Sequence, residues 1–333
     1  MTEIDLTRKS LIEEIKSAKK AKVIQPVEVG QTSKRNELVF FIKPELLDVD
    51  DNEKIFNSMA LIEGKFRDFQ VEVSGTAVVP GTFLEDHEIM NRHYGFINQL
   101  SRKASEMVDQ ETRSKMFEHL DIDDLAIHKV MGGHEFLEAF KADIETLNEI
   151  WFAQEANKLR SGFYFIADTY QARPILLVNG FHPSQLRHFT SKDHCILLLL
   201  LHTDTDWEDL KFKMVGDTFP ERADQDSIRG MLYKDPGKYG QADVGINTNG
   251  VHLSAGPFEA AFETVNFFGA LIDLDPEETP PLAIKKAVEL GLDKAQALTL
   301  MDNPTLNESD IFTETENLNT GEAVQLAIEK LFD

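Results

Sequence analysis

The unbroken apolar run 195–201 constrains the fold of this 333-residue chain more than any other feature of its sequence. The run is far shorter than the roughly eighteen apolar residues that a membrane span needs, but it has the length of a strand buried on both faces. We therefore expect residues 194–201 to form the central strand of a sheet. Cys195 is expected to be a core residue of that strand, because a reactive thiol needs exposure and a positive neighbour.

The spacing of apolar residues predicts three further strands and four helices around this run. Strands are predicted over 37–42, 69–79 and 250–254, and helices over 50–66, 85–107, 207–215 and 257–268. A long loop, 216–247, precedes the last strand. The order of these elements is the βαββαβ pattern of a ferredoxin-like sandwich, an α+β fold with helices on one face of an antiparallel sheet.

Changes in composition divide the chain into four parts. Residues 36–100 and 181–274 contain the elements above and form the predicted main domain. Residues 101–180 are interpreted as an inserted subdomain of helices and a hairpin, with strands over 162–168 and 173–179. Residues 1–35 are predicted to be an N-terminal helical extension, and residues 275–333 a C-terminal helical extension that begins with a proline-rich, acidic linker.

Charge and cysteine content limit the class of protein. The formal net charge of −24 makes nucleic acid an improbable main partner, because phosphate backbones attract clustered Lys and Arg, but a single nucleotide needs only a few local cations. One cysteine excludes an intramolecular disulfide and favours a reducing compartment. The mixed-charge N-terminus is not a signal peptide. We expect a soluble cytoplasmic protein without a membrane segment.

The segment 214–263 contains a group of residues suited to phosphoryl transfer. His252 ends a short predicted strand, and an imidazole can act as a nucleophile while nearby donors hold phosphate oxygens. Taken alone, His252 is better explained as a hydrogen-bonded histidine at a strand end, and Lys43 as a solvated lysine. Read together with Thr218, Arg229 and Asn249, they favour the chemical interpretation.

At these positions the sequence resembles the nucleoside diphosphate kinase family. Six short segments are similar to that family's motifs and occur in its order: Phe41-Ile42-Lys43-Pro44, His93-Tyr94, the residues from Met214 to Pro220, Ser227-Ile228-Arg229-Gly230, the residues from Asn249 to Ser254, and Glu263. The resemblance covers roughly residues 36–100 and 181–268, and the spacing from Arg229 to His252 is similar to that of the long-loop members.

The resemblance implies a role for each matched residue. His252 is the expected nucleophile, and Glu263 is expected to hydrogen-bond its other ring nitrogen. The nucleotide phosphates are expected to contact a further set of residues: Lys43, Tyr94, Thr218, Arg229, Asn249 and Ser254. The implied activity is transfer of the γ-phosphate of ATP or another nucleoside triphosphate to a nucleoside diphosphate, through a phosphohistidine and ping-pong kinetics. Mg²⁺ is expected to arrive with the nucleotide rather than to be held by protein carboxylates, and a homo-oligomer is expected.

Several positions depart from the family pattern. Phe212, between Lys211 and Lys213, stands where the family carries a second phosphate-binding arginine. Glu45 follows Lys43-Pro44 in place of an aspartate, and Ala255 replaces the aspartate after the signature serine. These departures leave a second interpretation open, in which the chain is a catalytically weak or inactive nucleotide-binding or scaffold protein that retains the fold.

Overall fold

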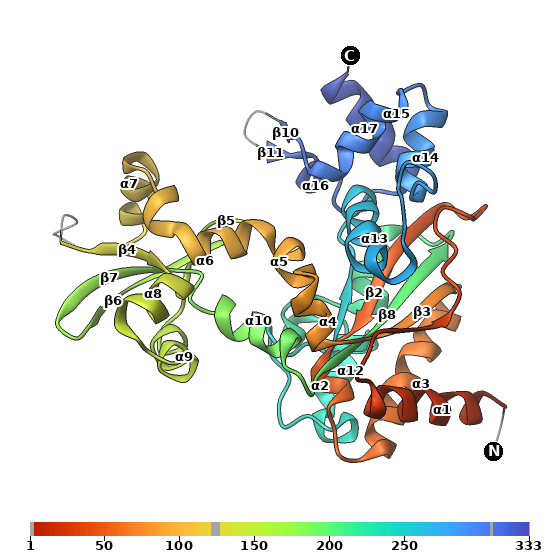
Figure 1. Ribbon diagram of the computed structural model, residues 1–333, viewed down its shortest axis with the longest axis horizontal. Coiled ribbons are helices and arrows are strands. Elements are labelled where there is room, and N and C mark those ends of the chain that lie inside the picture. Colours follow the sequence, from red (N-terminus) through yellow and green to blue (C-terminus); the bar gives the residue numbers. More distant parts are fainter. Residues whose placement is uncertain (1–2, 121–126, 307–308, 333) are drawn as a thin grey trace. The chain divides into compact units, whose positions relative to one another are not determined.

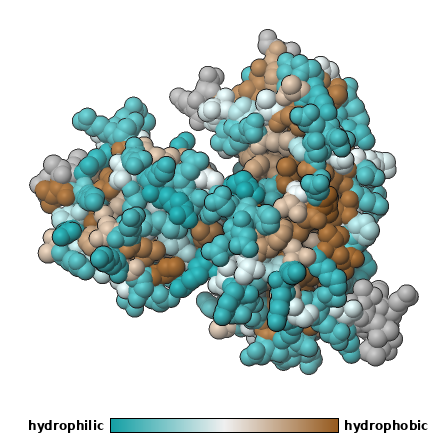
Figure 2. Space-filling model, in the orientation of Figure 1, coloured by the Kyte–Doolittle hydropathy of each residue, from teal (hydrophilic) through white to brown (hydrophobic). Residues whose placement is uncertain are grey.

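The computed structural model describes residues 3–120, 127–306 and 309–332 and contains two compact units (Figure 1). One consists of Met1–His87 together with Phe189–Asp333, and the other of Glu88–His188. Hydrophilic side chains cover much of the face drawn in Figure 2, as the 28% of charged residues leads one to expect. None of the described helices is both long enough and apolar enough to cross a bilayer.

A five-stranded antiparallel sheet forms the centre of the first unit. Its strand order is β1 (Lys22–Gln25), β3 (Glu72–Pro80), β8 (Cys195–Thr203), β2 (Asn36–Ile42) and β9 (Val251–Leu253). Every residue of β8 is buried, which confirms the central strand predicted from its apolar run, with Cys195 in the core. The predicted α+β class with an antiparallel sheet is also confirmed. β1 was not predicted, and its pairing with β3 joins part of the supposed N-terminal extension to the sheet.

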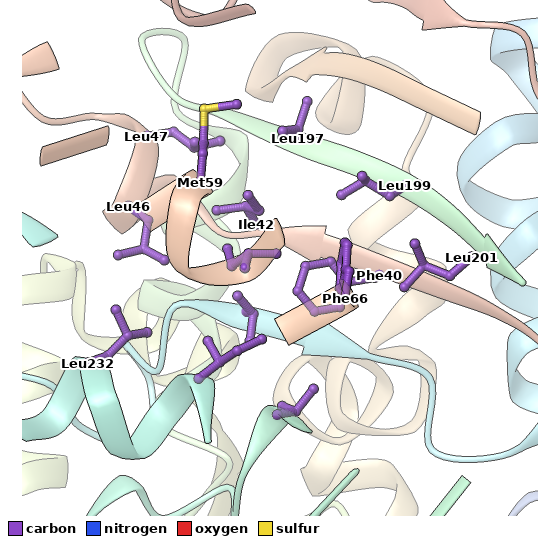
Figure 3. Close-up of a cluster of buried hydrophobic side chains, with 14 of the residues drawn as sticks. Phe40, Ile42, Leu46, Leu47, Met59, Phe66, Leu197, Leu199, Leu201 and Leu232 are labelled. Atoms are coloured by element: carbon purple, nitrogen blue, oxygen red, sulfur yellow. The ribbon is translucent and has the colours of Figure 1, made fainter. Parts of the chain in front are cut away.

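Helices cover both faces of this sheet, rather than the single face that was predicted. On one face, Phe40 packs edge-on against Phe66 of α3 (Asn52–Asp68), within the core drawn in Figure 3. On the other face, Phe41 packs against Phe267 of α13 (Pro257–Ile272), with ring centroids 5.3 Å apart. Neighbouring strand residues point to opposite faces, so one apolar strand needs a helix on each side.

Shorter helices complete the first unit around the sheet. α3 begins at Asn52, directly after its N-cap Asp51, whose side chain accepts a hydrogen bond from the Glu53 amide. The segment predicted to be one helix over 207–215 is α11 (Trp207–Asp209) followed by a π-helix, η1 (Leu210–Val215). The other short helices are α1 (Glu3–Ser17), α2 (Pro44–Leu47), α4 (Gly81–Asp86), η2 (Pro220–Arg222), α12 (Ile228–Lys234) and η3 (Pro236–Tyr239). The last three lie in the segment predicted to be a long loop.

The second unit is built on its own four-stranded sheet. The strand order is β4 (Lys129–Gly132), β7 (Arg173–Val178), β6 (Phe163–Tyr170) and β5 (Asn157–Arg160). The antiparallel pair β6 and β7 is the predicted hairpin, and β4 and β5 were not predicted. The helices are α5 (Ile89–His93), α6 (Gly95–Met107), α7 (Gln110–Glu118), α8 (Gly133–Phe140) and α9 (Ile144–Phe152), with α10 (His182–Thr190) at the boundary.

The unit begins at Glu88, whereas the insert was predicted to begin at 101. The helix predicted over 85–107 is broken into α4, α5 and α6, and Glu88 has a left-handed backbone with φ of 50°. Glu88 thus lies between α4, which ends at Asp86, and α5, which begins at Ile89.

The C-terminal part, 275–333, packs on α13 as a small helical layer. Its helices are α14 (Leu282–Glu289), α15 (Lys294–Thr299), η4 (Leu300–Asp302), α16 (Ile311–Glu314) and α17 (Thr320–Leu331), and the two-residue strands β10 (Thr305–Leu306) and β11 (Ser309–Asp310) form a ladder. Buried Glu37 of β2 ties this layer to the sheet, because its carboxylate accepts from the amides of Gly30 and Leu282 and contacts His202 Nε2 at 2.9 Å.

Candidate active site

Strand pairing places His252 opposite Phe41 at the edge of the sheet. Their rings stack with centroids 4.5 Å apart and an angle of 16° between the planes. Backbone hydrogen bonds anchor both ends of β9, from the Lys43 amide to the Gly250 carbonyl and from the Ser254 amide to the Val39 carbonyl. Gly250 has φ of +82°, and a side chain there would collide with Leu232, so glycine is required immediately before this strand. The imidazole is therefore presented from a fixed backbone.

Glu263 of α13 lies beside the imidazole. Its Oε1 is 2.7 Å from His252 Nε2, and its Oε2 accepts a hydrogen bond of 2.5 Å from Ser254 Oγ. Glu263 is completely buried. An ionised carboxylate only accepts hydrogen bonds, so a neutral His252 carries its proton on Nε2 and keeps the lone pair of Nδ1.

One helical turn before Glu263 lies a second carboxyl group, Glu259. Its Oε2 accepts from the Ala255 amide at 3.1 Å. Burial, together with the charge of Glu263, raises the pKa of Glu259 to about 8. Glu259 is therefore mostly protonated at neutral pH, which avoids a second negative charge next to Glu263.

Lys43 and Asn249 form a buried pair at the end of β2. Lys43 Nζ donates to Asn249 Oδ1 at 2.7 Å, and the lysine is only 9% exposed. Burial lowers the pKa of Lys43 to about 8, with Glu45 acting in the opposite direction and Arg229 in the same one. Asn249 Nδ2 donates to the carbonyls of Thr218 and Ile246. Asn249 thus fixes the direction of the lysine ammonium.

Arg229, in the first turn of α12, brings a second buried cation to this end of the sheet. Its two terminal nitrogens donate to the carbonyls of Gly216 (3.0 Å) and Val251 (2.9 Å), the latter directly before His252. Its buried Nε has no hydrogen-bond partner among the described atoms. Burial lowers the pKa of Arg229 to about 10, against the charges of Asp217 and Glu45. Two desolvated cations near one imidazole suit a polyanionic ligand.

The structure therefore connects most of the predicted residues within the first unit. Hydrogen bonds link Glu263 to both His252 and Ser254, and link Lys43 to Asn249. Thr218 is joined to the group through its backbone carbonyl, and its side chain is exposed. Tyr94 belongs to the second unit, where its ring packs 4.6 Å from His93 and 5.8 Å from His182.

Phe212 stands where the resemblance leads us to expect a phosphate-binding arginine, and its ring faces solvent. Phe212 is 42% exposed on the π-helix η1. The flanking Lys211 forms a short ion pair with Glu316, and Lys213 pairs with Asp209 at 2.7 Å. Both flanking cations are thus engaged by carboxylates.

Sequence reasoning missed the role of Glu45. Its Oε1 accepts a hydrogen bond of 2.9 Å from the Gly250 amide, and its charge lies near both Lys43 and Arg229. It had been noted only as a departure from a family motif. The available signal was a carboxylate two residues after a lysine at a strand end, which is a common arrangement and therefore weak.

Comparisons with known proteins add little to this geometry. No protein-family model matches the chain, and no curated protein is similar to it in sequence. Among solved structures, it is similar to a nucleoside diphosphate kinase from Encephalitozoon cuniculi, with 12% identity over 70% of this chain and 88% of the other. It is also similar to an NDP kinase from Pyrobaculum aerophilum, with 17% identity over 70% of this chain and 94% of the other. Both TM-scores are 0.35, which is too low to carry an argument, so the functional conclusion rests on the site itself.

Proposed function

We propose that this protein is a nucleoside diphosphate kinase that transfers a phosphoryl group through His252, on a ferredoxin-like sandwich. The observation that carries the proposal is the hydrogen-bonded series His252, Glu263 and Ser254 beside two buried cations. The first group prepares an imidazole nucleophile, and the cations favour a polyphosphate.

In the proposed reaction, the Nδ1 lone pair attacks the γ-phosphorus of a nucleoside triphosphate. An N–P bond forms, the P–O bond to the β-phosphate breaks, and its electron pair leaves with the diphosphate. A second diphosphate then reverses these steps and takes the phosphoryl group. Glu263 stabilises the positive charge that develops on the ring, as a carboxylate does for other catalytic histidines. Lys43 and Arg229 offset the charge on the phosphate oxygens.

Mg²⁺ is expected with the nucleotide, where it would neutralise phosphate charge. Three carboxylates near Lys43, Arg229 or His252 fit this arrangement, because Glu45, Asp217 and Glu263 already accept hydrogen bonds. Tyr94, Thr218 and Ser254 remain proposed contributors to nucleotide binding or to positioning.

We further propose a cytoplasmic protein that assembles at least as a dimer, which sedimentation at micromolar concentration would test.

The second candidate is a nucleotide-binding or scaffold protein with little or no activity. The observation that favours it is the exposed Phe212 between two lysines that are already paired with carboxylates. In that case nucleotide would bind at Lys43 and Arg229 without phosphorylating His252.

A phosphoenzyme assay separates the two candidates. The protein is incubated with γ-labelled ATP and Mg²⁺, and an acid-labile, base-stable label is expected on the parent and on His87→Ala, which alters an exposed histidine of the same unit. His252→Ala should carry no label. A parent protein that binds ATP but remains unlabelled would overturn the kinase proposal and support the second candidate.

A further inference from the structure

The C-terminal segment 315–320 lies directly against the turn that follows His252. The Asn317 amide donates to the Ala255 carbonyl at 2.9 Å, and a side chain on Gly256 would come within 2.7 Å of the Thr315 carbonyl oxygen. The turn 254–256 connects β9, which carries His252, to α13, which carries Glu263. The C-terminal layer therefore packs on the short connection that sets the separation of these two residues.

Asn319, the N-cap of α17, makes every hydrogen bond that its amide allows. Its Oδ1 accepts from Asn36 Nδ2 (2.9 Å) and from the Trp207 amide (3.1 Å). Its Nδ2 donates to Asp206 Oδ1 (2.9 Å) and to Glu322 Oε2 (3.0 Å). The residue is 7% exposed. A side chain with four bonds to three separate segments fixes their relative positions.

Trp207 connects Asn319 to the residues around His252. Its ring is completely buried, and its Nε1 donates to the Ser254 carbonyl at 2.9 Å. Ser254 Oγ in turn donates to Glu263, whose other oxygen contacts His252. Hydrogen bonds thus run from α17 through Trp207 and Ser254 to the imidazole.

We propose that Asn319 is a positioning residue for His252, so that the C-terminal layer is part of the machinery that holds the nucleophile in its Nε2–H form. The catalytic part of this inference rests on the proposed function. Loss of Asn319 would leave the Trp207 amide without its acceptor, would leave Asn36 Nδ2 with the Thr205 carbonyl alone, and would loosen the turn 254–256. The contact of 2.7 Å between Nε2 and Glu263 would then lengthen, and the second imidazole tautomer would become populated.

The test measures tautomer and rate separately in the full-length chain. Long-range ¹H–¹⁵N spectra report the tautomer of His252, whose signals are assigned by their loss in His252→Gln. The parent should show one Nε2–H tautomer, and Asn319→Ala should show a mixture. Phosphohistidine formation from ATP and Mg²⁺ should slow by between about tenfold and a hundredfold, which is the range expected for a slightly misplaced catalytic group. Trp207→Phe, which retains a ring but has no N–H, should change both readouts in the same direction.

Glu314→Gln is the matched control, since it breaks a pair with Lys330 in the same C-terminal layer without touching the turn. It should leave tautomer and rate unchanged. If Asn319→Ala does not fold, as judged by circular dichroism, Trp207→Phe decides the question. Folded variants with the parent's tautomer would overturn the inference. An unlabelled parent would instead refute the kinase proposal, while the tautomer comparison would still decide whether Asn319 positions the ring.

Discussion

The buried ammonium of Lys43 leads to a prediction about stability at alkaline pH. Burial places its pKa at about 8 in the folded protein, against 10.5 for a lysine exposed to water. Between these values the unfolded chain binds more protons than the folded one, so the free energy of unfolding rises with pH. The cost of burying the charge is fully present below pH 8 and is relieved as pH rises from 8 towards 10.5.

The size of the effect follows from this shift. At 1.36 kcal/mol for each pKa unit, a single lysine with these two pKa values gains about 2 to 3 kcal/mol of unfolding free energy between pH 7 and pH 10. Other groups titrate in this range, so the parent is compared with Lys43→Met, which keeps a long side chain but has no charge. The acceptor Asn249 Oδ1 loses its donor in this variant, and that cost does not depend on pH.

Urea unfolding at pH 7, 8, 9 and 10 provides the measurement. The chain has two tryptophans, and in a Trp151→Phe background the remaining Trp207 is a fluorescent reporter buried in the first unit. The unfolding free energy of the parent minus that of Lys43→Met should rise by about 2 to 3 kcal/mol from pH 7 to pH 10. A difference that stays flat across this range would refute the assignment of a desolvated, charged lysine at neutral pH.

Four further predictions follow from the same structure. Glu263→Gln should slow phosphohistidine formation about a hundredfold in a quench-flow assay, because losing the carboxylate beside a developing imidazolium removes about 2 to 3 kcal/mol of stabilisation. An unchanged rate would exclude the proposed role of this carboxylate. Phe212→Arg should raise kcat/KM for nucleoside diphosphates, since one hydrogen-bond donor to the transition state contributes about 2 to 4 kcal/mol in other enzymes. Phe212→Leu serves as its control, and equal activity of the two variants would contradict this prediction. Glu37→Ala should lower the unfolding free energy by about 3 kcal/mol, because the buried Gly30 amide, the buried His202 ring and the half-buried Leu282 amide lose their acceptor. Glu72→Ala, at a largely exposed pair with Lys34, should change little. The second unit should lose stability as pH falls below about 6.5, because burial lowers the pKa of His134 to about 3 and of His182 to about 4. The measurement is hydrogen exchange of the amides of that unit at pH 5, corrected for the slower base-catalysed chemical exchange at that pH. Corrected exchange that is faster at pH 5 would support the prediction, and unchanged protection would count against it.

The main strands could be predicted from sequence because their signals are local. The apolar run of β8 and the aromatic run of β2 reveal burial on both faces without any knowledge of the partner strands. β1 was missed because it has four residues, most of them exposed, and is held by its pairing with β3 rather than by an apolar pattern of its own. Short edge strands of this kind become visible only once the sheet exists.

The site shows the same division between local and long-range information. The group around His252 could be predicted because its residue types and spacing are unusual in combination. The contribution of Asn319 could not, because its partners Asn36 and Trp207 lie far away in the chain, and N-cap asparagines are common. Whether a neighbouring lysine replaces the arginine expected at Phe212 could not be predicted either. Lys211 forms its ion pair with Glu316, which lies more than a hundred residues away in the chain.

The second unit departs from and returns to neighbouring points of one sheet. Pro80 at the end of β3 pairs with Cys195 at the start of β8, and the amide of Gly81 donates to the carbonyl of His194 at 2.8 Å. These are the positions that a short turn would join in a plain hairpin. Because the entropy of closing a loop grows only with the logarithm of its length, by about 0.6 kcal/mol for each doubling, a whole folded body can occupy this turn at small cost to the sheet. Grafting a short glycine-serine connection at this junction is therefore expected to leave the five-stranded sheet intact in a shorter chain that lacks Tyr94.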